Sequence, residues 1–317
     1  MPTGAPRRVL VTGAGGFVAR HLIPRLRAAI PEAALTLCGP GPDMTPLDVA
    51  DAAAVDALVA AVRPEACVHL AAVSAIPAAR REPDLAWRVN LLGTLALADA
   101  VLRHAPACTF LFVSSADMYG RSFRSGLPLD ESAVLAPTNT YAATKAAADL
   151  ALGAMLADGL RLVRVRPFNH TGAGQSPEFV VPAFARQVMR VAAGLQPPVL
   201  RVGALDPLRD FLDVRDVCAA YVDCLGRRDA LEPGLILNIA SGVPRRVGDI
   251  LADLLRLAGV QATVETRDTL LRTADIPTAT GDAARARRLL DWQPAIAWED
   301  TLRAVLADWR GRVGDET

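Results

Sequence analysis

Two residues with the spacing for acid–base chemistry stand on one predicted helix. Tyr141 and Lys145 are four positions apart in "NTYAATKAAADLAL", so their side chains leave the same helix face about one turn apart. A phenol ordinarily loses its proton near pH ~10, and a neighbouring cation favours the phenolate. We therefore predict that Lys145 lowers the pKa of Tyr141 and that this phenol exchanges a proton with a substrate.

Lys145 is the only lysine of the chain, although lysine and arginine together number 34. An ammonium is a compact charge with several donors, whereas a guanidinium is broader and planar. Arginine supplies positive charge everywhere else, so the retained lysine indicates a site where the shape of the cation matters. The alternative is a solvated helix face on which a lysine persisted by chance.

A glycine-rich turn lies near the N-terminus, in "VLVTGAGGFVARHL". Gly13 and Gly16 separate a predicted strand from a helix, where glycines let backbone N–H groups approach a pyrophosphate. The third position of the dinucleotide fingerprint is Ala19, which is still small. The acidic residue expected about 20 positions later is absent, because Cys38 and Gly39 stand there. The turn predicts dinucleotide binding and leaves both NADP(H) and NAD(H) open.

Two further polar residues belong to the predicted ligand site. Ser115 ends the strand of "FLFVSSADMYG", at the carboxyl edge where doubly wound sheets bind ligands. We expect its hydroxyl to hydrogen-bond a substrate oxygen that Tyr141 protonates. Asp48 in "PLDVAD" is a candidate for the adenine side of the site, with a helix N-cap as the alternative.

The first half of the chain alternates apolar strands with amphipathic helices. This order predicts a Rossmann-type α/β fold, a doubly wound parallel sheet with helices on both faces. The predicted strands are "RRVLVTG", "ALTL", "ACVHLAA", "CTFLFVSS" and "LRLVRVRP". The predicted helices are Phe17–Ala29, Ala52–Val62, Asp84–His104 and Thr140–Leu156.

The pattern changes after Pro167, where loops become longer and strands shorter. We therefore expect a dinucleotide-binding domain over 1–168 and a smaller, partly interleaved substrate domain over 169–317, with segments around 203–240 returning to the first. Its predicted helices are Phe179–Gly194, Val214–Leu225, Val247–Leu257 and Trp298–Arg310. Its predicted strands are Val199–Val202, Ile236–Ile239 and Ala262–Thr266.

Composition narrows the class of protein. Of 317 residues, 52% are hydrophobic, and 34 basic residues balance 34 acidic ones, which argues against a disordered chain or a strongly basic nucleic-acid binder. Apolar runs are shorter than the roughly 20 residues of a membrane span, and no signal-peptide pattern is present. We expect a cytoplasmic protein without a membrane partner. The five cysteines lie in apolar segments without CxxC pairing, so we predict buried thiols and no metal site.

The glycine turn, the serine at a strand end and the Tyr-x-x-x-Lys pair together resemble the extended short-chain dehydrogenases/reductases, the NAD-dependent epimerase/dehydratase family. The resemblance covers essentially the whole chain. It implies that Ser115, Tyr141 and Lys145 are catalytic, and that the segments "HLAA" and "RVNLLGT" line the cofactor or support the catalytic helix. The implied cofactor-binding residues are Gly13, Gly16, Phe17, Val18, Asp48, Val49, Leu70, Ala71, Ala72, Asn90, Tyr141, Lys145 and Phe168.

The second half is similar to the GDP-6-deoxy-D-mannose reductases, through "RPFNHTGAGQ", "PLRDFLDVRDV" and "LRTADIPTATGDAARARRLLDWQP". The resemblance implies NAD(P)H-dependent reduction of the C4 keto group of GDP-4-keto-6-deoxy-D-mannose to GDP-D-rhamnose. Guanidinium forks at Arg209 and Arg272 suit a diphosphate. Alternatively, "RDFLDVRDV" is a charged turn and helix start, with Asp213 as N-cap and Asp216 in the first turn. The implied substrate-binding residues are Ser115, Asn169, Val180, Arg186, Arg209 and Arg272.

Different functions are also compatible with the sequence. A nucleotide-sugar 4,6-dehydratase needs a carboxylate beside the catalytic serine, and Asp117 has a comparable position. A nucleotide-sugar 4-epimerase and an inactive nucleotide-binding regulatory protein stay open as well. We interpret His170 as a hydrogen-bonded structural residue. The resemblance also implies a homodimer through helices like Asp84–His104 and Thr140–Leu156, whose alanine-rich faces would allow close packing into a four-helix bundle.

Overall fold

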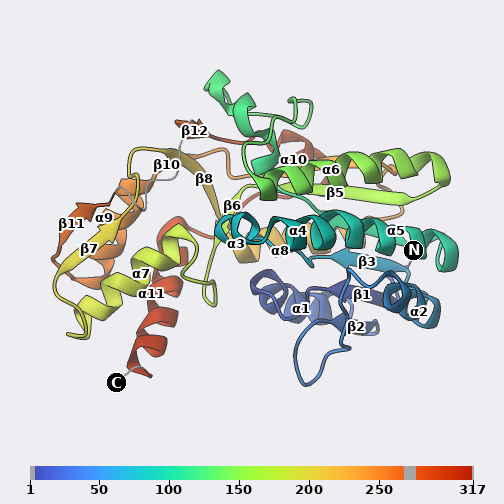
Figure 1. Cartoon of the computed structure of the whole chain (residues 1–317), viewed down its shortest axis with the longest axis horizontal. Helices are drawn as coiled ribbons and strands as arrows, with labels where there is room; N and C mark the ends of the chain where they lie inside the picture. Colours follow the sequence, from blue (N-terminus) through green and yellow to red (C-terminus); the bar gives the residue numbers. More distant parts are fainter. Residues whose placement is uncertain (1–3, 268–275, 316–317) are drawn as a thin grey trace.

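The structure is a computed structural model, and it describes residues 4–267 and 276–315. Its larger part is a six-stranded sheet whose paired strands are all parallel, in the order β2-β1-β3-β4-β5-β9 (Figure 1). This confirms the predicted Rossmann-type doubly wound fold. The strands are β1 (Arg8–Thr12), β2 (Ala34–Cys38), β3 (Ala66–His69), β4 (Thr109–Val113), β5 (Arg161–Pro167) and β9 (Leu235–Ile239).

Helices cover both faces of this sheet because successive strand side chains point to opposite sides. Val9 and Val11 pack into one apolar layer, whereas Leu10 between them packs into the other. The first layer contains α1 (Phe17–Ala29), α8 (Val214–Gly226) and α10 (Ala284–Leu290). The second contains α2 (Ala52–Val62), α5 (Thr94–His104) and α6 (Thr140–Ala154). Both faces of the strands are therefore buried, as their continuous apolar sequences predict.

One long predicted helix consists of three consecutive pieces. The segment predicted as Asp84–His104 comprises α4 (Pro83–Trp87), a π-helical turn η1 (Arg88–Gly93) and α5. It follows the short helix α3 (Ile76–Arg81) and contacts α6. π-helical turns are rare and occur frequently at functional sites. Asn90 lies inside this one.

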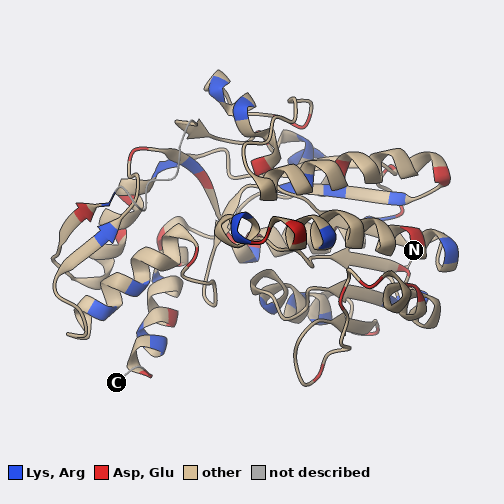
Figure 2. Cartoon of the chain, in the orientation of Figure 1, with Lys and Arg blue, Asp and Glu red and all other residues tan. Residues whose placement is uncertain are grey.

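The second region is smaller and has a core of its own. Helices α7 (Val180–Ala192), α9 (Val247–Ala258) and α11 (Trp298–Gly314) surround this core, together with strands β7 (Val199–Val202) and β11 (Thr263–Thr266). Figure 1 shows this group to the left of the large sheet. In Figure 2 acidic and basic segments are interspersed over both regions. The remaining strands form a small sheet in the order β10-β8-β12, with β6 also paired to β8.

The strands of the small sheet are the main elements that the sequence did not predict. They are β6 (Asn169–Thr171), β8 (Leu208–Asp213), β10 (Pro244–Arg246) and β12 (Thr278–Ala279). The interpretation of "RDFLD" as a charged turn is wrong, because β8 pairs with three partners that are distant in sequence. All five cysteines are buried free thiols, as expected.

Candidate active site

The catalytic candidates Tyr141 and Lys145 lie in the first two turns of α6. The helix begins at Thr140 because the side chain of Asn139 caps it, accepting a hydrogen bond of 2.9 Å from the Ala142 N–H. Tyr141 is half-buried at the start of the helix, and Lys145 is only 3% exposed. The structure confirms that both residues belong to one helix at the carboxyl end of the large sheet.

Ser115 lies two residues after the end of β4 and directly before a 3-10 segment, η2 (Ala116–Ser125). Its Oγ caps this segment by accepting a hydrogen bond of 3.1 Å from the Asp117 N–H. The Ser115 hydroxyl also lies near enough to the Tyr141 phenol to lower its pKa. Two residues that are 26 positions apart in the sequence are thereby brought together as predicted.

The electrostatics of the pair differ from the expectation. Burial and the nearby charge of Asp117 raise the pKa of Tyr141, while the Ser115 hydroxyl acts in the opposite direction. Burial lowers the pKa of Lys145 to about 7, against the effect of Asp149. The Lys145 ammonium donates a 2.6 Å hydrogen bond to the Val113 carbonyl. The prediction that Lys145 lowers the pKa of Tyr141 is therefore wrong for this structure, which keeps the phenol protonated.

The glycine turn forms a cradle that side chains would fill. Gly13 has a φ of +69°, and a Cβ there would lie 2.7 Å from the Ala71 backbone nitrogen. A Cβ at Gly15 would lie 2.9 Å from the Pro40 carbonyl oxygen, so Gly15 belongs to the turn although the fingerprint did not single it out. Gly16 caps α1. This geometry fits a pyrophosphate at the N-terminus of α1.

A cavity of about 230 Å³ opens beside this turn. It is lined by Thr12, Gly13, Cys38, Gly39, Pro40, Leu47, Asp48, Val49, Ala71, Ala72 and Val89. The Asp48 carboxylate accepts from the Ala50 N–H at 2.9 Å, and Asp51 is the residue that caps α2. The N-cap alternative for Asp48 is therefore wrong. The cradle and the cavity together fit the adenosine diphosphate part of a nicotinamide dinucleotide.

Three more cofactor candidates lie next to this cradle. Phe17 begins α1 and stacks on His170, and Val18 follows it. Leu70 directly precedes Ala71, and its N–H donates to the Thr12 carbonyl at 3.3 Å.

Two further cofactor candidates are buried. Asn90 is completely buried, and its amide bonds to Val73 and Thr144. Phe168 is 3% exposed and packs against the rings of Tyr119 and Phe123. Both side chains are buried, and their contact with a cofactor stays a prediction.

Arg209 is the substrate-binding candidate that the structure relates to the catalytic pair. It lies half-buried on β8, and its Nη1 donates to the Leu208 carbonyl at 2.7 Å and to the Pro277 carbonyl at 3.4 Å. Burial lowers its pKa, and the charge of Asp117 acts in the opposite direction. Because Asp117 also acts on Tyr141, the catalytic residues and this arginine share one electrostatic environment.

The remaining substrate candidates are less close to one another. Asn169 begins β6, and Val180 begins α7. The Arg186 guanidinium lies 5.9 Å from the ring centroid of Trp309 on α11, a contact within the second region. Arg272 lies outside the described residues.

Two predictions about non-catalytic residues are confirmed. The Asp213 carboxylate caps α8 by accepting from the Arg215 N–H at 2.8 Å, and Asp216 lies in the first turn. His170 is a structural residue, since its Nδ1 lies 2.9 Å from the Phe168 carbonyl oxygen.

A buried ionic network that the sequence did not predict supports the catalytic helix. Asp149, one turn after Lys145, is completely buried and accepts hydrogen bonds from Arg166 Nη2 at 2.8 Å and Arg164 Nη1 at 3.3 Å. Arg166 also donates to the Tyr119 hydroxyl at 3.1 Å. This network fastens α6 to β5. Its only signal in the sequence is a carboxylate within an otherwise apolar helix.

Comparisons with known proteins agree with this geometry. A family model described as GDP-mannose 4,6 dehydratase matches residues 40–305. The GDP-6-deoxy-D-mannose reductase of Pseudomonas aeruginosa is 37% identical over 311 residues, which cover 98% of this chain and 99% of that protein.

Solved structures show the same fold. The structure of RMD from Pseudomonas aeruginosa complexed with NADPH superposes with a TM-score of 0.86 at 36% identity, covering 96% of this chain and 98% of that one. A UDP-glucose 4-epimerase of Thermus thermophilus in complex with NAD has a TM-score of 0.83 at 26% identity, covering 96% and 99%. Because the family model matches residues 40–305, which are most of this chain, the chain belongs to the GDP-mannose 4,6 dehydratase family of extended short-chain dehydrogenases/reductases.

Proposed function

We propose that this protein reduces the C4 keto group of GDP-4-keto-6-deoxy-D-mannose to give GDP-D-rhamnose. The observation that carries the proposal is the proximity of the Ser115 hydroxyl to the Tyr141 phenol, whose pKa is raised by burial so that it stays protonated. A reductase needs a proton donor at this position, and a protonated phenol is ready to act as one. Similarity to a GDP-6-deoxy-D-mannose reductase along nearly the whole chain supports the choice of substrate.

The cradle at Gly13 and the cavity beside Asp48 would hold NADPH or NADH, which supplies the hydride for the carbonyl carbon when bound. Ser115 orients the carbonyl oxygen through its hydroxyl. Tyr141 then gives its proton to this oxygen, which becomes the C4 hydroxyl. Since the Asp117 N–H already donates to Ser115 Oγ, the serine is held in place before the substrate arrives.

Lys145 has a role that follows from its position. One of its three N–H donors is committed to the Val113 carbonyl, which fixes the ammonium at the end of β4. The other donors suit the ribose hydroxyls of the cofactor. Asp149 raises the pKa of the buried ammonium and so helps it to stay charged, because Asp149 carries the opposite charge.

The two regions divide the binding work. We assign residues 1–168, together with segments around 203–240, to the dinucleotide, since β9 pairs with β5 and α8 packs against α1. The remainder of 169–317 would bind the nucleotide sugar, and Arg209 on β8, which lies within the returning segments, would contribute the diphosphate ligand. Asp117 acts on both Arg209 and Tyr141. A sugar whose diphosphate binds Arg209 would therefore lie beside the phenol.

The test is oxidation of NADPH and NADH by the purified protein with the keto sugar, followed by absorbance. We expect consumption of one of these cofactors, and Tyr141→Phe should lower the rate by about 10²–10⁴-fold. Tyr221→Phe is the matched control, since its buried hydroxyl has no hydrogen-bond partner among the described residues, and it should lose far less activity. If neither NADPH nor NADH is oxidised, the proposal is contradicted.

A 4,6-dehydratase is the second candidate, because Asp117 acts on Tyr141 and a carboxylate is the group that an elimination requires. Incubation of the protein with GDP-mannose and oxidised cofactor separates the two reactions by mass spectrometry. Loss of water without net cofactor consumption, abolished by Asp117→Asn, would establish the dehydratase. Epimerisation without consumption would indicate an epimerase, and cofactor binding without any turnover would indicate a regulatory protein.

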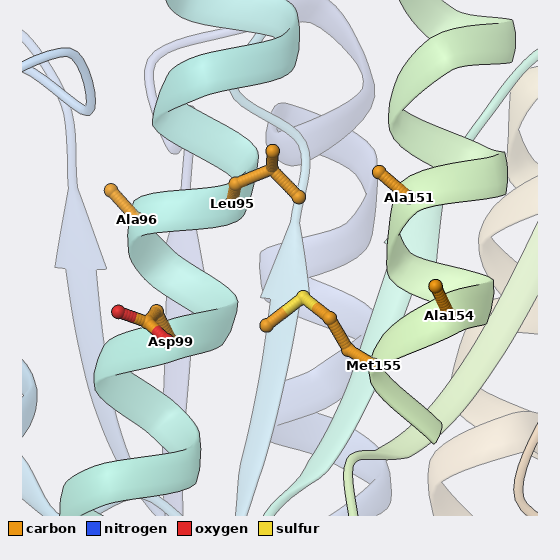
Figure 3. A pocket seen from close by; sticks show the side chains of 6 residues that line it. All are labelled: Leu95, Ala96, Asp99, Ala151, Ala154 and Met155. Carbon is orange, nitrogen blue, oxygen red and sulfur yellow. The ribbon is translucent and has the colours of Figure 1, made fainter. Parts of the chain in front are cut away.

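We also propose a homodimer. Trp87, Leu92 and Leu150 on α4, η1 and α6 are 37%, 57% and 62% exposed. A groove of about 420 Å³ separates α5 from α6, and in Figure 3 Leu95 and Met155 point into it from opposite sides. Its lining residues are Leu95, Ala96, Asp99, Ala151, Ala154 and Met155. Two copies that pair these helices would form a four-helix bundle and bury this apolar face.

The same helices bear on the membrane question. Within residues 4–267 and 276–315, one helix, Pro83–His104, has the length and apolar composition of a membrane span, and 44% of its apolar window is already buried. A dimer accounts for the exposed part of this helix. Light scattering should give a dimer mass, and Leu150→Glu should give a monomer, whereas Val134→Glu at an exposed loop position should not. A monomeric wild-type mass would contradict the dimer.

A further inference from the structure

A chain of completely buried polar side chains runs behind the active site. Thr12 Oγ1, at the end of β1, lies 2.7 Å from His69 Nδ1 at the end of β3. On the other side of the ring, His69 Nε2 lies 2.8 Å from Thr94 Oγ1. All three side chains have no exposed surface. Thr12 directly precedes Gly13 of the dinucleotide turn, so the chain begins at the cofactor cradle.

The direction of these hydrogen bonds is fixed by proton counting. The Thr94 hydroxyl has one proton, which it donates to the Asn90 carbonyl at 2.8 Å. Toward His69 it can therefore act only as an acceptor, which places a proton on Nε2. Nδ1 of the neutral ring is then an acceptor, and Thr12 donates its hydroxyl proton to it. Thr12 Oγ1 in turn accepts from the Ala71 N–H at 3.4 Å.

The chain continues from the π-helical turn to the catalytic helix. Asn90 Nδ2 donates to Thr144 Oγ1 at 2.9 Å, and the Thr144 hydroxyl donates to the backbone carbonyl of Tyr141 at 2.8 Å. Asn90 Oδ1 accepts from the Val73 N–H at 2.8 Å. Asn90 thus joins the segment after β3 to the first turn of α6, which carries the phenol.

The surroundings of His69 agree with a neutral imidazole. The ring packs near the aromatic rings of Phe110 and Phe112 on β4, with centroids 6.0 and 6.1 Å away. Lys145 is the charged group that acts on it, and an ammonium repels a second positive charge. Burial and Lys145 together lower the pKa of His69 to about 3.

We propose that Thr12, His69, Thr94 and Asn90 are positioning residues. They form one unidirectional hydrogen-bond chain, with the His69 proton on Nε2, that sets the Tyr141 helix relative to the dinucleotide turn. The catalytic role of Tyr141 rests on the proposed function, whereas the hydrogen-bond chain does not depend on it. Because every buried donor in the chain has one acceptor, the loss of a hydroxyl at one end leaves an unsatisfied polar group that the rest of the chain must accommodate.

The first measurement is made on the wild-type protein, and a variant serves only to assign the signal. In ¹⁵N-histidine-labelled protein, the nitrogen shifts of an imidazole distinguish its two neutral tautomers and its charged form. We expect His69 to show the neutral pattern with the proton on Nε2 at pH 6–8 (about the range of its ordinary titration), and His69→Gln assigns the signal among the four histidines. An Nδ1-protonated or charged ring would overturn the proposal.

The second measurement compares matched variants by NADPH binding, followed by fluorescence, and by the tautomer spectrum. Thr94→Val keeps the side-chain shape and removes the hydroxyl, whereas Thr94→Ser keeps the hydroxyl. We expect Thr94→Val to disturb the pure Nε2–H pattern and to weaken NADPH binding by about tenfold, the equivalent of one buried hydrogen bond. Thr94→Ser should restore both. Thr94 does not line the cofactor cavity, so a merely local role would leave NADPH affinity unchanged.

Coupling along the chain is measured by a double-mutant cycle. Thr12→Val should also weaken NADPH binding, and Thr12→Val with Thr94→Val should weaken it by less than the product of the two single effects, since both act through His69. The proposal would be overturned if the double variant weakened NADPH binding by the product of the two single effects. Equal behaviour of Thr94→Val and Thr94→Ser would also overturn it. Thermal unfolding shows whether each variant is folded. If a variant does not fold, the imidazole nitrogen spectrum of the wild-type protein tests the proposal. If the keto sugar is not reduced while these results hold, only the proposed function fails.

Discussion

The Lys145 ammonium nitrogen lies 2.6 Å from the carbonyl oxygen of Val113, the last residue of β4. Its other close neighbour is the ring of Phe112, with the centroid 4.6 Å away. The lysine therefore ties the catalytic helix to the strand that ends beside Ser115. A guanidinium is broader and planar, so we expect it to fit this buried position less well than the ammonium does.

Replacement of Lys145 by arginine tests this expectation. We expect Lys145→Arg to lower the reduction rate by about 10²–10⁴-fold, as for the loss of an acid–base group, although the charge is kept. Lys145→Met, which removes the charge, should be comparably inactive. Steady-state kinetics with the keto sugar check the result. A Lys145→Arg variant with nearly full activity would show that charge alone suffices.

The buried ammonium should also cost stability in a pH-dependent manner. The pKa of Lys145 is lowered from 10.5 to about 7, so between these values the unfolded chain binds a proton that the folded protein has lost. Stability of the wild type therefore rises with pH across this window, and the full penalty is present below pH ~7. We expect Lys145→Met to raise the free energy of unfolding by a few kcal/mol at pH ~6.

The advantage of Lys145→Met should shrink as the pH rises from about 7 toward 10.5, because the wild-type lysine becomes neutral in the fold. Denaturant unfolding of both proteins at several pH values measures this difference. A stability difference that does not change with pH would mean that burial does not lower the pKa of Lys145.

Ser115 and its neighbour offer a matched pair of substitutions. Ser115→Ala removes the hydroxyl that meets Tyr141, and we expect the rate of reduction to fall by about 10²–10³-fold, as for the loss of an oxyanion donor. Ser114→Ala removes a buried hydroxyl that bonds to the Met118 sulfur instead, and its rate should stay near that of the wild type. Equal effects of the two substitutions would speak against a role of Ser115 in the reaction.

The ionic network under α6 should be important for stability. Asp149→Asn leaves Arg166 and Arg164 buried without their carboxylate, and breaking a buried ion pair costs about 3–5 kcal/mol. Asp253→Asn removes a surface partner of Arg256 and should cost less than ~1 kcal/mol. Urea unfolding measures both. Similar losses would show that the Asp149 network contributes no more than a surface pair.

Local patterns in the sequence were sufficient for most elements of the large domain. The helices Phe17–Ala29 and Ala52–Val62 have the predicted bounds, because their apolar period and their flanking residues act locally. The five predicted strands of the first half all belong to the parallel sheet. β8 was missed because its alternating charges resemble a turn, and its strand conformation depends on partners from three distant segments.

By itself, the sequence determined the residue types and the local spacing of the site: a phenol and an ammonium on one helix face, a serine at a strand end and a glycine turn before a helix. Tertiary structure alone decided how these groups act on one another. Packing turned Asn90 and Phe168 inward, directed the Lys145 ammonium to Val113, and raised the pKa of Tyr141. Desolvation and non-local hydrogen bonds depend on which segments meet in space, and no local spacing encodes that.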